Sequence, residues 1–329
     1  MAMLTRDAGR AEAGATDLIM RRHGPHIGDA TPPVLTFLTT FRFDPVAFAG
    51  LLVAGGLYAA GILRTRRAGR PWPLLPTLGF YLLGLGSYAW VSFGFLGAYS
   101  QELRWAFTTR IALLLFVVPA LVAIGRPVQL ARRVLGGASL RVVERVLGSW
   151  FVRLVGNAIF APVFAIAAFL VFLTPLAFVL RDSPVAAAGL TILVPLAGLL
   201  MVLPMSAHAG TRTSLFITAE FMLAFVELVM DAIPGILLRL NEAVLDHAPA
   251  VLGWHQAWFP SPLHDQHLSG DFLWFIAELA DIPVLIILFL RWTRTDRREA
   301  RQMDDLTDEE MAALTAAHLG VRTGRPPGS

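Results

Sequence analysis

The sequence predicts an all-α fold: a polytopic membrane protein built as a seven-transmembrane-helix bundle, with the N-terminus outside the cell and the C-terminus in the cytoplasm. Three observations lead to this prediction. Hydrophobic residues make up 56% of the 329 residues and charged residues 16%, whereas soluble domains are about 45–50% apolar and about 25% charged. Seven apolar runs reach the length needed to cross a bilayer. Arginines gather in alternate connections between these runs.

Residues 1–45 are predicted to form a weakly ordered extracytoplasmic tail. Arginines and acids are mixed there with turn-forming residues such as Gly24, Pro25, Pro32 and Pro33. The apolar stretch 34–40 is too short to span a bilayer, so we expect it at the interface. No cleavable signal sequence is visible in this region, so the first span is expected to direct insertion.

Residues 46–292 are predicted to form the membrane domain. Its seven spans are expected at 46–63, 74–96, 106–125, 156–180, 185–205, 214–239 and 271–292. Proline recurs inside these spans, for example at Pro119 and Pro234. Neighbouring helices or water must then satisfy the carbonyl groups that proline leaves without a donor.

The placement of arginine predicts the orientation. Arginines crowd the connections 64–72 and 126–154 and the flank that follows residue 290, which lie on the same side of a seven-span chain. Because cytoplasmic loops carry an excess of basic residues, this side is predicted to be the cytoplasm. Residues 293–329 then form a cytoplasmic tail, in which the Thr307, Glu310 and Gly320 signals predict a short amphipathic helix.

The residue types and motifs that the chain lacks exclude several classes of function. The chain has no cysteine, which excludes disulfides, thiol catalysis and thiolate metal sites. Its 27 basic residues are all arginine, and without a soluble basic domain they indicate contact with the lipid bilayer and no binding of nucleic acid. The chain also lacks a phosphate-binding loop, a nucleophile elbow and an HExxH motif, so we do not expect an enzyme.

Carboxylates inside the predicted spans are the strongest functional signal from the residues alone. Glu220, Glu227 and Asp231 are spaced so that they share one face of the sixth span. Glu278 and Asp281 lie in the antiparallel seventh span, and Glu278 matches the depth of Asp231. A carboxylate facing hydrocarbon is costly, so these residues are expected to face each other. They form either a cavity for a proton or cation, or hydrogen bonds between helices.

Two further groups offer metal ligands. The predicted external loop 240–270 contains half of the histidines: His247, His255, His264 and His267. His264 and His267 share a face if their segment is helical, which suits a borderline divalent ion or copper; the alternative is a solvated loop at the lipid headgroups.

The second group follows one face of the fifth span and consists of Met201, Met205 and His208. Thioether and imidazole are ligands that suit Cu(I), but methionine also fills gaps in packed cores. Of the two groups, the outer histidines are the preferred copper candidates.

Four sets of residues, in this order and spacing, resemble one family. They are Asp44-Pro45 with Leu57-Tyr58 and Trp72-Pro73; Pro119 to Gly125 with Arg126-Pro127; Asp265-Gln266 with Gly270 and Trp274; and Trp292 with Asp296 to Arg301. Together they are similar to the CtaG family of cytochrome c oxidase assembly proteins, seven-span membrane proteins linked to maturation of the copper site of the oxidase. The resemblance covers about residues 44–304.

The resemblance implies a factor in the bacterial cell membrane that acts as a chaperone in cytochrome c oxidase assembly, with oxidase subunits as partners and copper as its cargo. The family's usual histidine pair on the third span is replaced in this chain by Phe107 and Ile111. This replacement argues against copper binding at that place, whereas His208 matches a further typical histidine. The alternative is a small transporter or channel that conducts protons or cations through the carboxylate cluster, but no internal repeat favours it.

Overall fold

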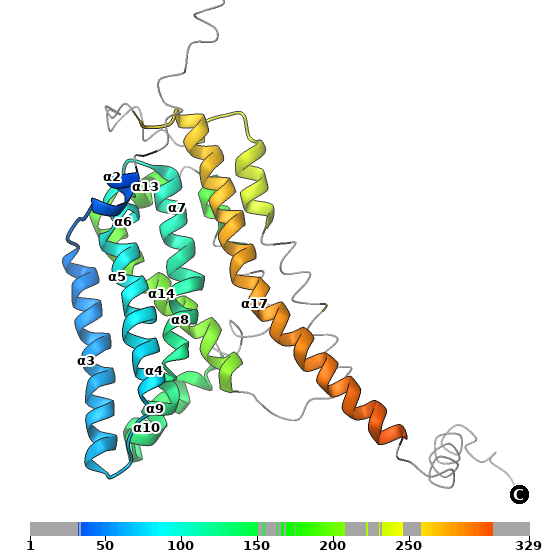
Figure 1. Ribbon diagram of the computed structural model, residues 1–329. Coiled ribbons are helices and arrows are strands. Elements are labelled where there is room, and N and C mark those ends of the chain that lie inside the picture. Colours follow the sequence, from blue (N-terminus) through cyan, green and yellow to red (C-terminus); the bar gives the residue numbers. More distant parts are fainter. Residues whose placement is uncertain are drawn as a thin grey trace, which may run out of the picture.

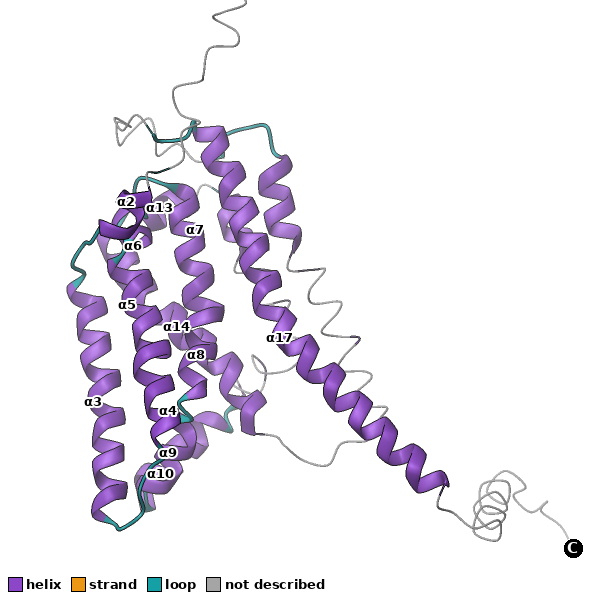
Figure 2. Cartoon of the chain, in the orientation of Figure 1, coloured by secondary structure: helices purple, strands orange, loops and turns teal. Residues whose placement is uncertain are grey.

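Every secondary-structure element in the part of the chain that the structure describes is helical (Figure 2). The computed structural model describes residues 34–150, 169–174, 176–207, 232–245 and 258–304, with isolated residues at 32, 154, 163, 166, 167, 222 and 230. Within these residues the predicted all-α class is confirmed.

The helices pack side by side as a bundle, and one long helix, α17, leans away from the bundle (Figure 1). Their bounds are α2 Val34–Thr39, α3 Pro45–Arg67, α4 Leu74–Leu78, η1 Gly79–Leu85, α5 Gly86–Phe93, α6 Phe95–Tyr99, α7 Arg104–Ala112, η2 Leu113–Val117, α8 Val118–Ile124, α9 Pro127–Val134, α10 Gly137–Leu147, η3 Val171–Leu173, α13 Leu176–Asp182, α14 Pro184–Ala207 and α17 Pro262–Asp304. The elements η1 and η2 are π-helical, and η3 is a short 3-10 turn.

Among the described residues, four helical stretches are long and apolar enough to cross a membrane: Pro45–Arg67, Leu74–Tyr99, Arg104–Ile124 and Pro184–Val202. They coincide with four of the predicted spans. Part of the predicted span 156–180 and most of the predicted span 214–239 lie outside the described residues. The predicted span 271–292 lies within α17, a continuous helix of 43 residues. The count of seven spans and the orientation of the termini stay predictions.

Two predicted loops contain helix. The connection 126–154 carries α9 and α10. In the predicted loop 240–270, α17 already begins at Pro262, because proline suits the first turn of a helix and the Ser261 hydroxyl accepts the His264 backbone N–H at 3.3 Å. The prediction that residues 262–270 form a loop is therefore wrong.

The third span changes its winding ahead of Pro119, where Leu113–Val117 forms the π-helical stretch. A proline lacks an N–H and its ring displaces the carbonyl four residues earlier, in this span that of Leu115. Gly198 of α14 packs against this place. An added Cβ at Gly198 would lie 2.0 Å from the Leu115 oxygen and 2.5 Å from Pro119 Cγ. The absence of a side chain thus lets α14 approach the proline site closely.

The helix α7 is central to the bundle, since all nine of its residues are buried. Its Phe107 and Ile111 join the main hydrophobic cluster together with Leu273 and Ile276 of α17. The same helix also buries Arg104, Thr108, Thr109 and Arg110. Buried polar groups are costly unless they are hydrogen-bonded, so α7 needs polar partners on the surrounding helices.

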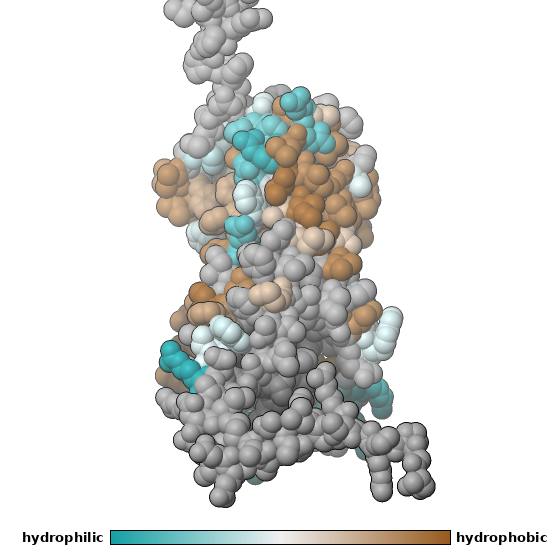
Figure 3. Space-filling view, turned by 90° about the vertical axis from the view of Figure 1, so that its right-hand side faces the viewer, coloured by the Kyte–Doolittle hydropathy of each residue, from teal (hydrophilic) through white to brown (hydrophobic). Residues whose placement is uncertain are grey.

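The outer surface of the helices is largely apolar. Phe275 and Leu279 of α17 are 61% and 51% exposed, and Leu52 of α3 is 60% exposed. Figure 3 shows hydrophobic residues covering much of the upper half of the face that it turns to the viewer. Apolar surface of this extent is typical of helices that contact lipid.

Candidate functional site

Two clusters of polar side chains meet α7 at the end of the bundle where α3, α7 and α17 begin, which we call the upper end (top of Figure 1). The Asp44 cluster consists of Asp44, Tyr88, Arg110 and Thr191. The Asp265 cluster consists of Arg104, Thr108, Asp265, Gln266 and Ser269. Together they supply polar partners for the side chains of Arg104, Thr108 and Arg110 of α7.

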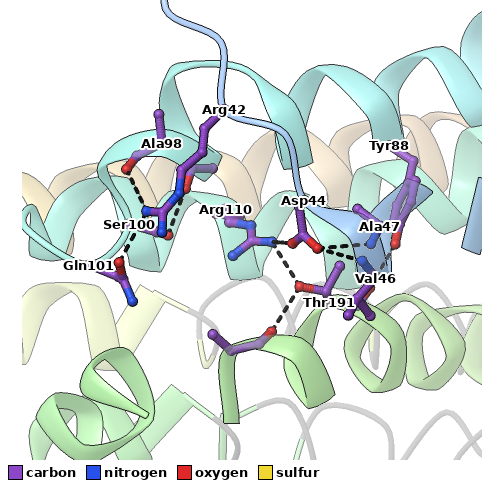
Figure 4. A network of polar contacts seen from close by, with 12 residues as sticks. Arg42, Asp44, Val46, Ala47, Tyr88, Ala98, Ser100, Gln101, Arg110 and Thr191 are labelled. Carbon is purple, nitrogen blue, oxygen red and sulfur yellow. Dashed lines mark hydrogen bonds and ion pairs between the residues drawn. The ribbon is translucent and has the colours of Figure 1, made fainter. Parts of the chain in front are cut away.

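The Asp44 cluster joins α3, α5, α7 and α14 (Figure 4). Asp44 caps α3, because its Oδ1 accepts the backbone N–H groups of Val46 at 2.8 Å and Ala47 at 3.1 Å. Its Oδ2 lies 3.6 Å from Nη2 of Arg110. The same Nη2 donates to the Thr191 hydroxyl at 2.9 Å, and Tyr88 donates to the Thr191 carbonyl at 3.1 Å.

Arg110 is the member of this cluster that most needs polar partners, since its charged side chain is only 5% exposed, against 26% for Asp44. An unpaired buried guanidinium would be strongly destabilising, whereas an ion pair with further hydrogen bonds offsets the cost of desolvation. The cluster therefore fixes α3 and α14 against α7. Nearby, Arg42 donates to the Gln101 side chain at 3.1 Å and extends the polar layer (Figure 4).

The Asp265 cluster caps α7 from another helix. Asp265 of α17 accepts the backbone N–H groups of Arg104 at 2.8 Å and Trp105 at 2.9 Å, which are unsatisfied donors of the first turn of α7. Thr108 and Ser269 share a short hydrogen bond between the same two helices. The start of α7 is thereby held by α17 through a carboxylate and a hydroxyl.

Gln266 extends this contact to the segment that precedes α17. Its Oε1 accepts from Arg104 Nη1 at 3.2 Å and from the Leu245 backbone N–H at 2.9 Å. Its Nε2 donates to the carbonyl oxygens of Asn241 at 3.2 Å and Ala243 at 3.0 Å. Gln266 is 1% exposed, and its amide is fully used.

Burial raises the pKa of Asp265 from 3.8 to about 6, while its two backbone donors and the nearby Arg181 and Arg104 act in the opposite direction. The carboxyl is therefore mostly ionised at neutral pH and gains its proton in mildly acidic conditions. As an anion it suits the positive end of α7.

A third polar contact lies at the opposite end of the bundle, where α3 and α8 end, which we call the lower end. The Tyr58 hydroxyl donates to the Gly125 carbonyl at 2.7 Å and accepts from Trp72 Nε1 at 3.0 Å. The Tyr58 ring stacks on Phe80 with centroids 3.8 Å apart. Tyr58, Trp72 and Gly125 belong to the first two residue sets on which the family resemblance rests, so that part of the resemblance reflects helix packing.

The structure leaves the predicted carboxylate cluster untested. Glu220, Glu227 and Asp231 lie outside the described residues, as does the side chain of Asp281. Glu278 lies on α17, is partly buried, and accepts a short hydrogen bond from Trp274 Nε1 one turn earlier. Asp271, on the same helix, pairs with Arg239 at 3.2 Å. The proposed meeting of Asp231 and Glu278 stays a prediction.

The structure places two of the four outer histidines. His264 and His267 lie one turn apart at the start of α17, so the helical condition for sharing a face is met. His267 Nε2 lies 3.3 Å from the Asn241 carbonyl oxygen. His247 and His255 lie outside the described residues. Among the residues that the structure describes, no three His, Cys, Asp or Glu side chains group in a way that could hold a metal.

The family resemblance implies a histidine pair at the positions of Phe107 and Ile111, but in the structure these two residues belong to a cluster of apolar side chains. Both are buried, and the partly buried Met201 of α14 packs against their cluster. Neither side chain carries a metal-binding atom, so these two residues do not fit a copper ion. The side chain of Met205 and all of His208 lie outside the described residues.

Sequence reasoning missed the ion pair of Asp44 with Arg110 and the capping of α7 by Asp265. The available signal was Arg110 itself, a cation within the predicted span 106–125, because a charge inside a span needs a partner. The family resemblance included Asp44 and Asp265 but gave neither residue a structural role.

A cavity at the upper end lies beside Arg181, is lined by Gln101, Glu102, Phe178 and Asp182, and measures about 100 Å³. Typical ligand sites measure about 300–1,000 Å³, so this cavity is too small for one.

In the part of the chain that the structure describes, four helices are able to cross a membrane, an ion pair joins two of them, and a carboxylate of α17 caps α7; these features define an α-helical protein of the membrane-spanning class. Comparison with known families goes further. The family described as cytochrome c oxidase caa3 assembly factor (Caa3_CtaG) matches residues 56–295, and the chain belongs to this family. The match contains α7 and the start of α17, so both partners of the Asp265 cap lie within it.

Similar proteins are found in mycobacteria, where they are named only as uncharacterized. A protein of Mycobacterium bovis is 27% identical over 299 residues, which cover 87% of this chain and 45% of that protein. A protein of Mycobacterium tuberculosis gives the same values, and one of Mycobacterium leprae is 27% identical over 289 residues, covering 85% and 44%. The chain thus spans less than half the length of these relatives. No solved structure gives a significant match.

Proposed function

We propose that this protein is a non-enzymatic factor of the bacterial cell membrane that assists the assembly of cytochrome c oxidase by holding an oxidase subunit and delivering copper to it. The observation that carries the proposal is the family match over residues 56–295. Four apolar helices of spanning length support a membrane location. The proposed topology has seven spans with the N-terminus outside, which puts the upper end on the extracytoplasmic side.

Copper is the proposed cargo, and His264 and His267 are its proposed ligands. The chain has no cysteine, so imidazole, thioether and carboxylate are the donors that it offers. The two rings start one turn apart on α17, a firmer support than a loop. When His267 carries its proton on Nε2, it donates to the Asn241 carbonyl 3.3 Å away and presents Nδ1 to a metal. Such a hydrogen bond fixes the tautomer of many metal-binding histidines.

Two imidazoles form a weak site, which suits transfer of the ion. The predicted carboxylates Glu227, Asp231 and Glu278 would attract a cation toward α17, through charges that the low dielectric of the membrane screens poorly. We propose that His247 and His255 complete the ligand set when the ion is held.

The test is the double variant His264→Ala/His267→Ala, assayed for copper bound per protein and for oxidase maturation in cells. His23→Ala/His26→Ala is the matched control, because it removes two histidines with the same spacing from the N-terminal tail. We expect the first variant to lose copper and matured oxidase and the control to keep both. Loss of neither in the first variant would contradict copper delivery through α17 and leave subunit holding as the function.

A further inference from the structure

The helix α10 at the lower end buries none of its side chains. It nevertheless has two distinct sides. At about 100° per residue, its apolar residues lie together on one side, opposite its charged residues. The apolar residues are Leu140, Val142, Val143, Val146 and Leu147, and the charged residues are Arg141, Glu144 and Arg145.

The apolar side of α10 is open at Val142 and Val146, whereas Leu140, Val143 and Leu147 are half-buried. Val142 is 54% exposed and Val146 is 50% exposed, and Trp150, shortly after the helix, is 71% exposed. Exposed valines on a strongly amphipathic helix, followed by an exposed tryptophan, are typical of segments that lie in the interface between water and lipid.

The preceding helix, α9, fixes where α10 lies. Leu130 of α9 is 3% exposed and fits against Gly61 of α3, where an added Cβ would come within 2.9 Å of it. The Arg133 guanidinium lies 5.0 Å from the centre of the Trp72 ring. These contacts tie α9 to the lower end, where α3 and α8 end (Figure 1). α10 follows α9 after Leu135 and Gly136, at the level where the ends of spanning helices meet lipid headgroups.

The charge of the lower end is complementary to anionic lipid. The segments 64–72 and 126–150 contain one acid, Glu144, and nine arginines: Arg64, Arg66, Arg67, Arg70, Arg126, Arg132, Arg133, Arg141 and Arg145. Each basic residue near an anionic membrane strengthens binding about fivefold, and the guanidinium group binds phosphate with two hydrogen bonds.

We propose that α10 lies along the membrane surface at the lower end, with Val142 and Val146 inserted at the acyl boundary and Arg141 and Arg145 bound to the phosphates of anionic phospholipids. This lipid contact does not depend on the oxidase or on copper. It requires only that the four long helices span the bilayer.

Because the chain lacks cysteine, spin labels can be placed singly in the full-length protein. Val142→Cys, Val146→Cys, Arg141→Cys and Arg145→Cys are labelled with a nitroxide and reconstituted into nanodiscs. Leu52→Cys on the exposed side of α3 serves as the lipid reference, and Ala68→Cys in the exposed turn after α3 serves as the water reference. Accessibility to oxygen, which enters lipid, is compared with accessibility to a water-soluble nickel chelate.

In nanodiscs that contain phosphatidylglycerol, labels at 142 and 146 should resemble the Leu52→Cys reference and labels at 141 and 145 the Ala68→Cys reference. In pure phosphatidylcholine the labels at 142 and 146 should move toward the water reference. Arg141→Gln with Arg145→Gln should produce the same move with phosphatidylglycerol present, since losing two arginines weakens surface binding about 30-fold.

Labels at 142 and 146 that are shielded from both reagents would show a protein partner instead. Equal accessibility of these labels in both lipids would refute headgroup binding. Either result overturns the proposal.

Discussion

The carboxylate of Asp44, which caps α3, lies 3.6 Å from the guanidinium of Arg110 in the buried helix α7. This pair can be tested with a double-mutant cycle. Asp44→Asn keeps a helix-capping side chain but leaves a buried cation unpaired, which should cost about 3–5 kcal/mol of unfolding free energy. Adding Arg110→Met removes that cation, so the double variant should be more stable than Asp44→Asn alone. The measurement is unfolding of the purified protein in mixed detergent micelles, and strictly additive effects would show that the two residues are not coupled.

The pH dependence of stability should report Asp265. Its pKa is about 6 in the folded protein and about 3.8 when unfolded, so between these values the folded state binds more protons than the unfolded state. The free energy of unfolding should therefore fall by up to about 3 kcal/mol as the pH rises from about 4 to about 6. Asp265→Asn should flatten this slope. An unchanged slope in the variant would mean that other groups produce it.

Because α14 packs closely against the Pro119 site, alanine substitution should affect stability very differently at two glycines of this helix. Gly198→Ala places a methyl group against the Leu115 carbonyl and should destabilise the protein by about 1–3 kcal/mol. Gly189→Ala is the control, because an added Cβ there meets nothing within 4 Å. Alanine favours helix, so the control should be neutral or slightly stabilising. Equal effects at both positions would show that the packing of α14 does not require glycine at position 198.

Single cysteines test the proposed orientation. Arg66→Cys and Arg132→Cys, at the lower end, should resist an impermeant thiol reagent in intact cells, whereas Ser261→Cys at the start of α17 should react. All three positions are exposed, so a lack of reaction reflects the side of the membrane. Reaction at 66 and 132 with protection at 261 would reverse the topology.

The sequence predicted four spanning helices closely because long apolar runs carry their own signal. It did not predict α9 and α10, since Arg132, Arg133, Arg141 and Arg145 made an amphipathic surface segment look like a loop. The early start of α17 was visible in Ser261-Pro262 but was outweighed by the polar residues that follow.

The candidate site was harder to predict for a physical reason. Arg110 is paired by Asp44 and Thr191, and α7 is capped by Asp265, from positions far away in the chain. No local periodicity encodes such contacts. By contrast, the spacing of His264 and His267 predicted that they share a face if their segment is helical, and the structure places both in the helix α17.

The proposed role in oxidase assembly is tested most directly by the amount of assembled cytochrome c oxidase in membranes of a strain that lacks this gene, measured from its haem spectrum and copper content. Assembled oxidase should fall strongly on deletion and return with the wild-type gene. The stable control Gly189→Ala should restore the oxidase fully. Unchanged oxidase in the deletion strain would contradict a role in oxidase assembly.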